Sequence, residues 1–215
     1  MEQVLSRNVP IETDKATLLF IDVQNYSTHR NGSEYKGLSE AEFNQKFGYF
    51  FDTIENETIP NMVKIQQACR DKSVEVMYTV ICNLTKDGRD RSLDYKITGF
   101  NVPKGSWDGE VFDAIKPLED EIVLPKSSSS VFVSTNIDYV LRNLGTRYLI
   151  VCGFLTDQCV ESAIRDACDL GYLVTMVTDA CATQSQERHD KSVSCIKGYC
   201  RQITTDDFLK ELSGL

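Results

Sequence analysis

Three side chains with complementary chemistry follow apolar runs of the sequence. Asp22 ends the run ATLLFID, Lys126 follows DEIVLP, and Cys159 comes shortly after RYLIVCG. A thiol can act as a nucleophile, a carboxylate can take its proton and pass it to a leaving amine, and an ammonium can hold that carboxylate ionised. The three residue types therefore fit covalent catalysis with an amine leaving group.

The position of Cys159 favours a reactive thiol. We expect a helix over QCVESAIRDACDLG, with Asp157 as its cap. Unpaired N–H groups and the positive end of the dipole in a first helical turn lower a thiol pKa, and these N–H groups can form an oxyanion hole. The charge of Asp157 would act in the opposite sense, raising the thiol pKa and disfavouring anionic substrates.

Each of the three residues also has an ordinary structural explanation. A cysteine in an α/β core most often packs, an aspartate at a strand end often forms a turn or cap, and a lysine there is usually solvated. The joint occurrence of all three at strand ends favours the catalytic interpretation. Cys152 in a strand and Cys168 in a helix are expected to be core residues.

The elements that would position these side chains are indicated by the hydrophobic pattern. Short runs rich in aliphatic residues alternate with amphipathic stretches, which predicts a parallel α/β sandwich. In such a sheet, ligands bind at the carboxyl ends of the strands, where the three residues are expected to meet. The predicted strands cover residues 16–22, 74–82, 120–125, 147–153, 172–179 and 201–205.

Several helices have clear start signals. Ser39 precedes one amphipathic stretch, Pro60 could occupy the first position of a second helix, and Ser134 or Thr135 precedes a third. Thr204 or Thr205 would begin the last helix. Residues 83–108 form the longest polar stretch without periodicity, which predicts a lid or a pocket wall.

Composition limits the class of protein. A chain of 215 residues with 41% hydrophobic content is sufficient for one domain over residues 1–215. The net charge of -9, with acidic and basic residues interspersed, argues against nucleic acid or an anionic membrane as a partner. We find no export signal and no run long enough to span a membrane, so we expect a cytoplasmic protein.

The cysteines and histidines predict neither a disulfide framework nor a metal site. The eight cysteines lie in apolar periodic segments of a chain expected in the cytoplasm, where thiols stay reduced. Cys195 and Cys200 near His189 match no closed zinc pattern, and the chain has only two histidines. The glycine-rich loops that bind nucleotide phosphates do not occur either, so we expect no cofactor and no metal.

The motifs LLFIDVQN, IVLPK and VCGFLTDQCVESAIRDACDLGYLVTMVTDACAT, in this order, resemble those of the isochorismatase-like cysteine hydrolases. The resemblance runs from about residue 16 to residue 205. It implies a Rossmann-like three-layer sandwich with a six-stranded, mostly parallel sheet. It also implies a dimer or a tetramer, because relatives form such homo-oligomers.

The same resemblance implies a role for each reactive residue. Asp22 would be the proton shuttle, Lys126 its electrostatic partner and Cys159 the nucleophile, which forms a thioester during hydrolysis of an amide-type C–N bond. A cis peptide bond is expected at Leu155–Thr156. The backbone N–H groups of Leu155 and Cys159 would then form the oxyanion hole.

The run PKGSWDGEVFDAIKPLEDEIVLPK is similar to the ureidoacrylate and carbamoyl amidohydrolase branch, which implies a small linear amide or ureido substrate. Tyr26, Asn83 and Trp107 are candidate pocket residues. Isochorismatase-type vinyl-ether hydrolysis is an alternative that proceeds without the cysteine, and nicotinamide hydrolysis is another. A scaffold without activity is the alternative that is not an enzyme.

Overall fold

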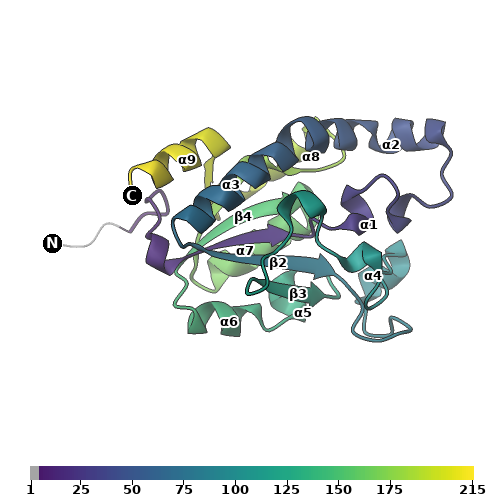
Figure 1. Cartoon of the computed structure of the whole chain (residues 1–215), viewed down its shortest axis with the longest axis horizontal. Helices are drawn as coiled ribbons and strands as arrows, with labels where there is room; N and C mark the ends of the chain where they lie inside the picture. The colour runs from purple at the N-terminus through teal and green to yellow at the C-terminus, as the bar shows by residue number, and fades with distance from the viewer. Residues whose placement is uncertain (1–4) are drawn as a thin grey trace.

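The computed structural model describes residues 5–215 and contains one six-stranded sheet (Figure 1). All five strand pairs are parallel, in the order β3-β2-β1-β4-β5-β6. The strands are β1 (Ala16–Ile21), β2 (Glu75–Ile81), β3 (Ile122–Lys126), β4 (Tyr148–Phe154), β5 (Leu173–Ala182) and β6 (Arg201–Ile203). The six predicted strands and the predicted α/β fold are confirmed. Strands β2 and β3 are added on one side of β1 and strands β4, β5 and β6 on the other, so the order of strand addition reverses between β1 and β4, the usual place for a ligand site.

Helices cover both faces of this sheet (Figure 1). The helices are α1 (Asn25–Thr28), α2 (Glu40–Thr53), α3 (Ile59–Asp71), α4 (Leu93–Thr98), α5 (Val131–Ser134), α6 (Ile137–Asn143), α7 (Glu161–Asp169), α8 (Gln186–Ile196) and α9 (Thr205–Ser213). Side chains of α2, α3 and α9 share one buried cluster with alternate residues of β1, whereas α5, α6 and α7 pack with the other residues of β1.

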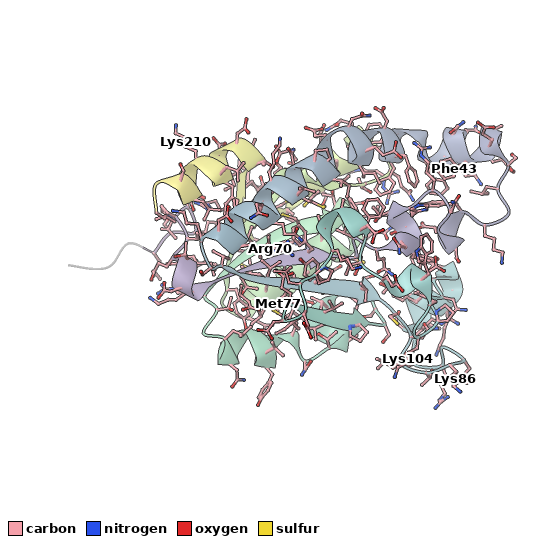
Figure 2. All side chains as sticks on the ribbon, viewed as in Figure 1. Phe43, Arg70, Met77, Lys86, Lys104 and Lys210 are labelled. Atoms are coloured by element: carbon pink, nitrogen blue, oxygen red, sulfur yellow. The ribbon has the colours of Figure 1, made fainter. Side chains whose placement is uncertain are left out.

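The central strand β1 explains why the apolar runs are continuous. Leu18 and Phe20 point to the face covered by α2 and α3, while Leu19 and Ile21 point to the face covered by α6 and α7. Because successive side chains of a strand alternate between faces, a sheet covered on both sides needs apolar residues at every position. Figure 2 shows Met77 of neighbouring β2 in the same interior.

The helix predicted to begin at Pro60 does not begin there. A π-type turn at Ile54–Thr58 joins α2 directly to α3, and Pro60 is the second residue of α3. Proline has no N–H to donate to the preceding turn, and the wider turn changes the hydrogen-bonding register where that donor is missing. The two predicted helices therefore form one continuous helical segment.

Other helix starts agree with the sequence more closely. Ser39 caps α2 with a reciprocal hydrogen bond to Glu42, and Thr204 caps α9. Helix α6 begins one residue later than predicted, after Asn136, although the Thr135 hydroxyl accepts a hydrogen bond from the Ile137 N–H. Short polar side chains at these positions satisfy N–H groups that the helix itself leaves free.

Residues 83–108 are more regular than their lack of periodicity predicted. They contain α4, which is capped by the Ser92 hydroxyl and ends at Gly99, whose φ is +88°. The outer end of the segment carries Lys86 and Lys104, which point away from the body of the protein (Figure 2). In the described part of the chain, no helix has the length and apolar character needed to cross a membrane.

Candidate active site

Asp22, Lys126 and Cys159 meet at the carboxyl edge of the sheet. The Lys126 Nζ atom lies 2.8 Å from Asp22 Oδ2 and 3.3 Å from Cys159 Sγ. The Lys126 side chain is fully buried, and Asp22 and Cys159 are 2% and 5% exposed. The predicted meeting of base, ammonium and thiol is therefore present, in a site almost closed to bulk solvent.

Asp22 and Lys126 reach each other across the end of β2. Asp22 follows β1 directly with a φ of 56°, a left-handed conformation that aspartate tolerates better than most residues. On β2, the Thr79 carbonyl accepts from the Asp22 N–H, and its hydroxyl donates to Asp22 Oδ1 at 3.0 Å. Lys126 ends β3, on the far side of β2. The carboxylate is thus fixed before any substrate binds.

The turn that carries Cys159 depends on Gly153. A Cβ atom at this glycine would lie 2.2 Å from the Ile21 carbonyl oxygen, so only glycine allows β4 to run this close to the end of β1. A π-type turn over Thr156–Val160 follows and leads into α7. This packing places the cysteine in the same cavity as Asp22, where the order of strand addition reverses between β1 and β4.

The cis peptide bond is not at the predicted position. It joins Phe154 to Leu155, one residue before the predicted Leu155–Thr156 bond. Strand β4 continues through Phe154, beyond the predicted end at residue 153, but the turn starts within the strand end rather than after it. Leu155 still lines the cavity beside Cys159.

The thiol pKa is shifted in the direction opposite to the expected one. Burial raises the pKa of Cys159 to about 12, although the Lys126 ammonium lowers it. Removing a thiolate from water costs more free energy than its attraction to the Lys126 ammonium restores. Burial also lowers the pKa of Lys126, but the negative charge of Asp22, and that of the Cys159 thiolate when it forms, raise it further, so its net shift is upward. The resting site holds a neutral thiol beside a charged ammonium.

Asp157 does not cap a helix, contrary to prediction. It lies inside the π-type turn, and its carboxylate accepts hydrogen bonds from the Arg188 Nε atom at 2.6 Å and from the Thr183 hydroxyl at 2.5 Å. The negative charge is therefore balanced by a guanidinium of α8. The predicted repulsion between Asp157 and the thiolate is correspondingly weakened.

Tyr95 belongs to the site but was not predicted from the sequence. Its hydroxyl oxygen accepts from Lys126 Nζ at 2.9 Å and lies 3.7 Å from Cys159 Sγ. It comes from α4, within the segment expected to form a lid or wall. The cap at Ser92 and the stop at Gly99 are sequence signals that could have identified this helix.

A cavity opens above the thiol, with an empty volume of about 470 Å³ including its mouth. Tyr26 lines it, as predicted. Asn83 and Trp107 are not among its lining residues, and their role in binding stays a prediction. Asn83 donates to the Asn101 side chain at 2.7 Å and holds the loop, while Trp107 packs edge-on against His29, with 5.0 Å between the ring centres.

The lining of the cavity is largely aromatic. Polar groups come from two glutamines, a serine, two tyrosines, the Cys159 thiol and the carboxylates of Asp22 and Glu34. Its residues are Asp22, Tyr26, Ser27, Glu34, Tyr35, Phe47, Phe50, Ile81, Phe100, Phe154, Leu155, Gln158, Cys159 and Gln184. Within residues 5–215, no cluster of three or more histidine, cysteine or acidic side chains could hold a metal ion. All eight cysteines are free thiols.

Comparison with known proteins gives consistent results. Residues 16–207 match the isochorismatase domain. The ureidoacrylate amidohydrolase RutB of Rhizobium rhizogenes is 29% identical over 192 residues, which cover 80% of this chain and 72% of the relative.

Two solved structures have the same fold. A cysteine hydrolase from Pseudomonas syringae superposes with a TM-score of 0.82 at 22% identity, over 100% of this chain and 99% of the other. The N-carbamoylsarcosine amidase of Thermoplasma acidophilum has a TM-score of 0.68 at 23% identity, over 89% and 97% of the two chains. The predicted superfamily and its amidohydrolase branch are confirmed by these matches. The chain belongs to the isochorismatase family of hydrolases.

Proposed function

We propose that this protein is a cysteine-dependent amidohydrolase that cleaves a linear amide or ureido C–N bond through a thioester on Cys159. The predicted enzyme class, a hydrolase of C–N bonds other than peptide bonds, is supported by the family and by the amidohydrolase relatives. One observation carries the mechanism: the Lys126 ammonium contacts both Asp22, at 2.8 Å, and Cys159, at 3.3 Å.

The first half of the reaction forms the thioester. Because the thiol is neutral at rest, Asp22 takes its proton as Sγ attacks the carbonyl carbon of the substrate. The carbonyl becomes an oxyanion, stabilised in this proposal by the N–H groups of Leu155 and Cys159. When the C–N bond breaks, the Asp22 carboxyl returns the proton to the departing nitrogen, and ammonia or an amine leaves.

The second half restores the enzyme. Asp22, ionised again, takes a proton from a water molecule that attacks the thioester carbon. The C–S bond breaks, the acid product leaves, and the proton on Asp22 returns to the sulfur. Asp22 is thus used twice, once for each proton transfer.

Lys126 supports both halves without exchanging a proton. Its Nζ atom lies close to four partners: Asp22 Oδ2, Cys159 Sγ, the Tyr95 hydroxyl and the Ser128 carbonyl at 2.8 Å. An ammonium has only three N–H donors, so these contacts compete. As negative charge moves from the carboxylate to the sulfur, the ammonium can redistribute its hydrogen bonds without moving.

The substrate class follows from the relatives. The names of two of them specify a ureidoacrylate amidohydrolase and an N-carbamoylsarcosine amidase, and both substrates contain a ureido or carbamoyl group. The free thiol beside a base favours this chemistry over vinyl-ether hydrolysis, which does not need the cysteine. The intact set of three residues argues against a scaffold without activity. We further infer a cytoplasmic homo-oligomer, a dimer or a tetramer.

The proposal is tested by ammonia release from ureidoacrylate, biuret, N-carbamoyl amino acids, nicotinamide and small aliphatic amides. We expect turnover of at least one ureido or linear amide compound and its loss in Cys159→Ala, by roughly 10⁴-fold or more. The matched control is Cys195→Ala, which removes an exposed thiol and should change nothing. Activity on nicotinamide alone, or full activity of Cys159→Ala, would overturn the proposal.

A further inference from the structure

A second carboxylate, that of Glu34, lines the cavity above Cys159. Its side chain is partly buried, and no hydrogen-bond or ion-pair partner for it occurs among residues 5–215. The surrounding wall is aromatic. Burial raises the pKa of Glu34 to about 7, since an unpaired carboxylate loses hydration there without a compensating partner. The mechanism above does not use this group.

The neighbours of Glu34 are firmly held. The Ser33 N–H and hydroxyl both donate to the Asp108 carboxylate, at 3.1 and 2.5 Å. The Tyr35 hydroxyl donates to the Ser27 carbonyl at 2.6 Å, and its ring packs against Phe43, with 5.1 Å between centroids. Phe43 projects from α2 (Figure 2). Glu34 therefore lies between two anchored residues and is presented to the cavity by the fold.

The turn before this segment is equally constrained. A Cβ atom at Gly32 would lie 2.1 Å from the Tyr26 carbonyl oxygen, so the backbone approaches α1 as closely as it can. Tyr26 itself lines the cavity beside Glu34, and the Glu34 charge contributes to the raised pKa of the Tyr26 phenol. The phenol stays neutral and supplies no positive charge.

Among residues 5–215, no cationic side chain forms an ion pair with Glu34. The fourteen lining residues include no lysine, arginine or histidine. The ammonium of Lys126, below the cavity, is paired with Asp22. Arg188 donates to Gln184 of the lining but forms its ion pair with Asp157, and Arg91 donates to the carbonyls of Gly88 and Phe100. The charge of an ionised Glu34 is thus left for a ligand.

We propose that Glu34 is a specificity-determining residue that selects ureido or amide substrates bearing a cationic amine remote from the scissile bond. This inference rests on the proposed function and names its substrate class. A charged hydrogen bond in a desolvated pocket is strong because the ammonium replaces the hydration that the carboxylate has lost. A substrate carboxylate would instead face a like charge in the same apolar surroundings.

The inference separates this chain from the relative named above. Ureidoacrylate carries a carboxylate, and the cavity of this chain offers no unpaired basic side chain to receive one. Glu34 lies in the segment between α1 and α2, twelve residues after Asp22 and far in sequence from Lys126 and Cys159. The group proposed to select the substrate is therefore outside the three strand ends that carry the reactive residues.

The test uses three alkylureas of equal chain length that end in an ammonium, a methyl or a carboxylate group. Wild-type kcat/KM, measured by ammonia release, should be highest for the ammonium compound and lowest for the carboxylate. In Glu34→Gln the value for the ammonium compound should fall roughly tenfold to a hundredfold, the methyl compound should change by less than about threefold, and the carboxylate compound should improve. Glu119→Gln, an exposed site with the same charge change, should leave all three values unchanged.

Binding provides a second readout that does not need turnover. Calorimetry on Cys159→Ser should give the same order of affinity, and Glu34→Asp should retain that order in weaker form. A wild-type preference for the carboxylate compound, or an equal loss for all three in Glu34→Gln, would overturn the role of Glu34. Binding in the predicted order without turnover would instead contradict the proposed hydrolysis and leave the role of Glu34 supported, so the two failures are distinguishable.

Discussion

Two carboxylates line the same cavity, and their surroundings differ completely. Asp22, at the floor, pairs with the Lys126 ammonium at 2.8 Å and accepts the Thr79 hydroxyl at 3.0 Å. Glu34, on the wall, contacts aromatic surface and has no charged partner in the described part of the chain. A carboxylate paired with an ammonium can stay ionised and exchange a proton with a neighbouring thiol, whereas a buried carboxylate without a charged partner attracts a cation. The roles proposed for the two carboxylates therefore follow from their different environments.

The first way to test the comparison is the state of the thiol above Asp22. Because the thiolate is the reactive form and the Cys159 pKa is raised to about 12, alkylation by iodoacetamide should accelerate about tenfold per pH unit between about pH 7 and about pH 10. Mass spectrometry of the Cys159 peptide measures the rate. The exposed Cys195 is the internal reference. A rate that levels off below about pH 8 would show a preformed thiolate and contradict this account.

Stability measurements should also distinguish the two carboxylates, through one variant at each that removes a charge. Lys126→Met leaves Asp22 buried without its partner and should lower the free energy of unfolding by about 3–5 kcal/mol. Glu34→Gln removes an unpaired, desolvated charge and should be neutral or slightly stabilising. Denaturant titrations measure both. Asp22→Asn combined with Lys126→Met should recover much of the lost stability but no activity.

If Lys126→Met had wild-type stability, the ion pair with Lys126 would not be needed to keep the Asp22 carboxylate buried, and this account would be contradicted. A loss in Glu34→Gln as large as that in Lys126→Met would show a hidden partner for Glu34. The two variants therefore test opposite ends of the same comparison, and each serves as the control for the other.

The pH dependence of selectivity sharpens the comparison further. Glu34, with its pKa raised to about 7, is neutral well below that pH and ionised above it. The ratio of kcat/KM for the ammonium-terminated and methyl-terminated ureas should therefore rise about tenfold from about pH 5.5 to about pH 8.5. Titration of the catalytic groups affects both substrates and cancels in this ratio.

The two phenols and the ammonium next to this cavity keep their charge in this range. Burial raises the pKa values of Tyr26 and Tyr35 above their ordinary values, and the Lys126 ammonium has its pKa raised as well. In Glu34→Gln the ratio should be flat across the same pH range. A slope that persists in this variant would assign the effect to another group.

The smallest effect is expected at Tyr95. Tyr95→Phe removes the hydroxyl that accepts from Lys126 Nζ at 2.9 Å but keeps the ring, so kcat should fall roughly fivefold to twentyfold, about 1–2 kcal/mol. The selectivity for the ammonium-terminated urea should not change, because the hydroxyl lies at the floor. A change in selectivity without a change in kcat would show that the Tyr95 hydroxyl acts on substrate binding and not on the reacting groups.

The sequence was sufficient to predict the features that regular strands and helices determine. Continuous apolar runs identify strands covered on both faces, and parallel strands bring their carboxyl ends to one edge, so Asp22, Lys126 and Cys159 could be placed together in advance. Local signals were also sufficient for the caps at Ser39 and Thr204. These features depend on neighbours in sequence or on the geometry of a regular sheet.

Features that depend on tertiary contacts could not be predicted in the same way. The raised thiol pKa of Cys159 reflects burial, which outweighs the local turn that suggested the opposite shift. Continuity of the helix through Pro60 depends on a π-type turn that has no simple sequence signature. Glu34 lies in an irregular segment, and only the fold brings it to the cavity of Cys159.

The central claim, covalent catalysis at Cys159, is tested most directly by trapping the intermediate. A reaction with a ureido substrate is quenched in acid within the first turnover, and the protein is analysed by intact and peptide mass spectrometry. We predict an added mass equal to the acyl part of the substrate, confined to the Cys159 peptide and absent from Cys159→Ser. Steady turnover with no adduct, together with retained activity in Cys159→Ser, would contradict the account.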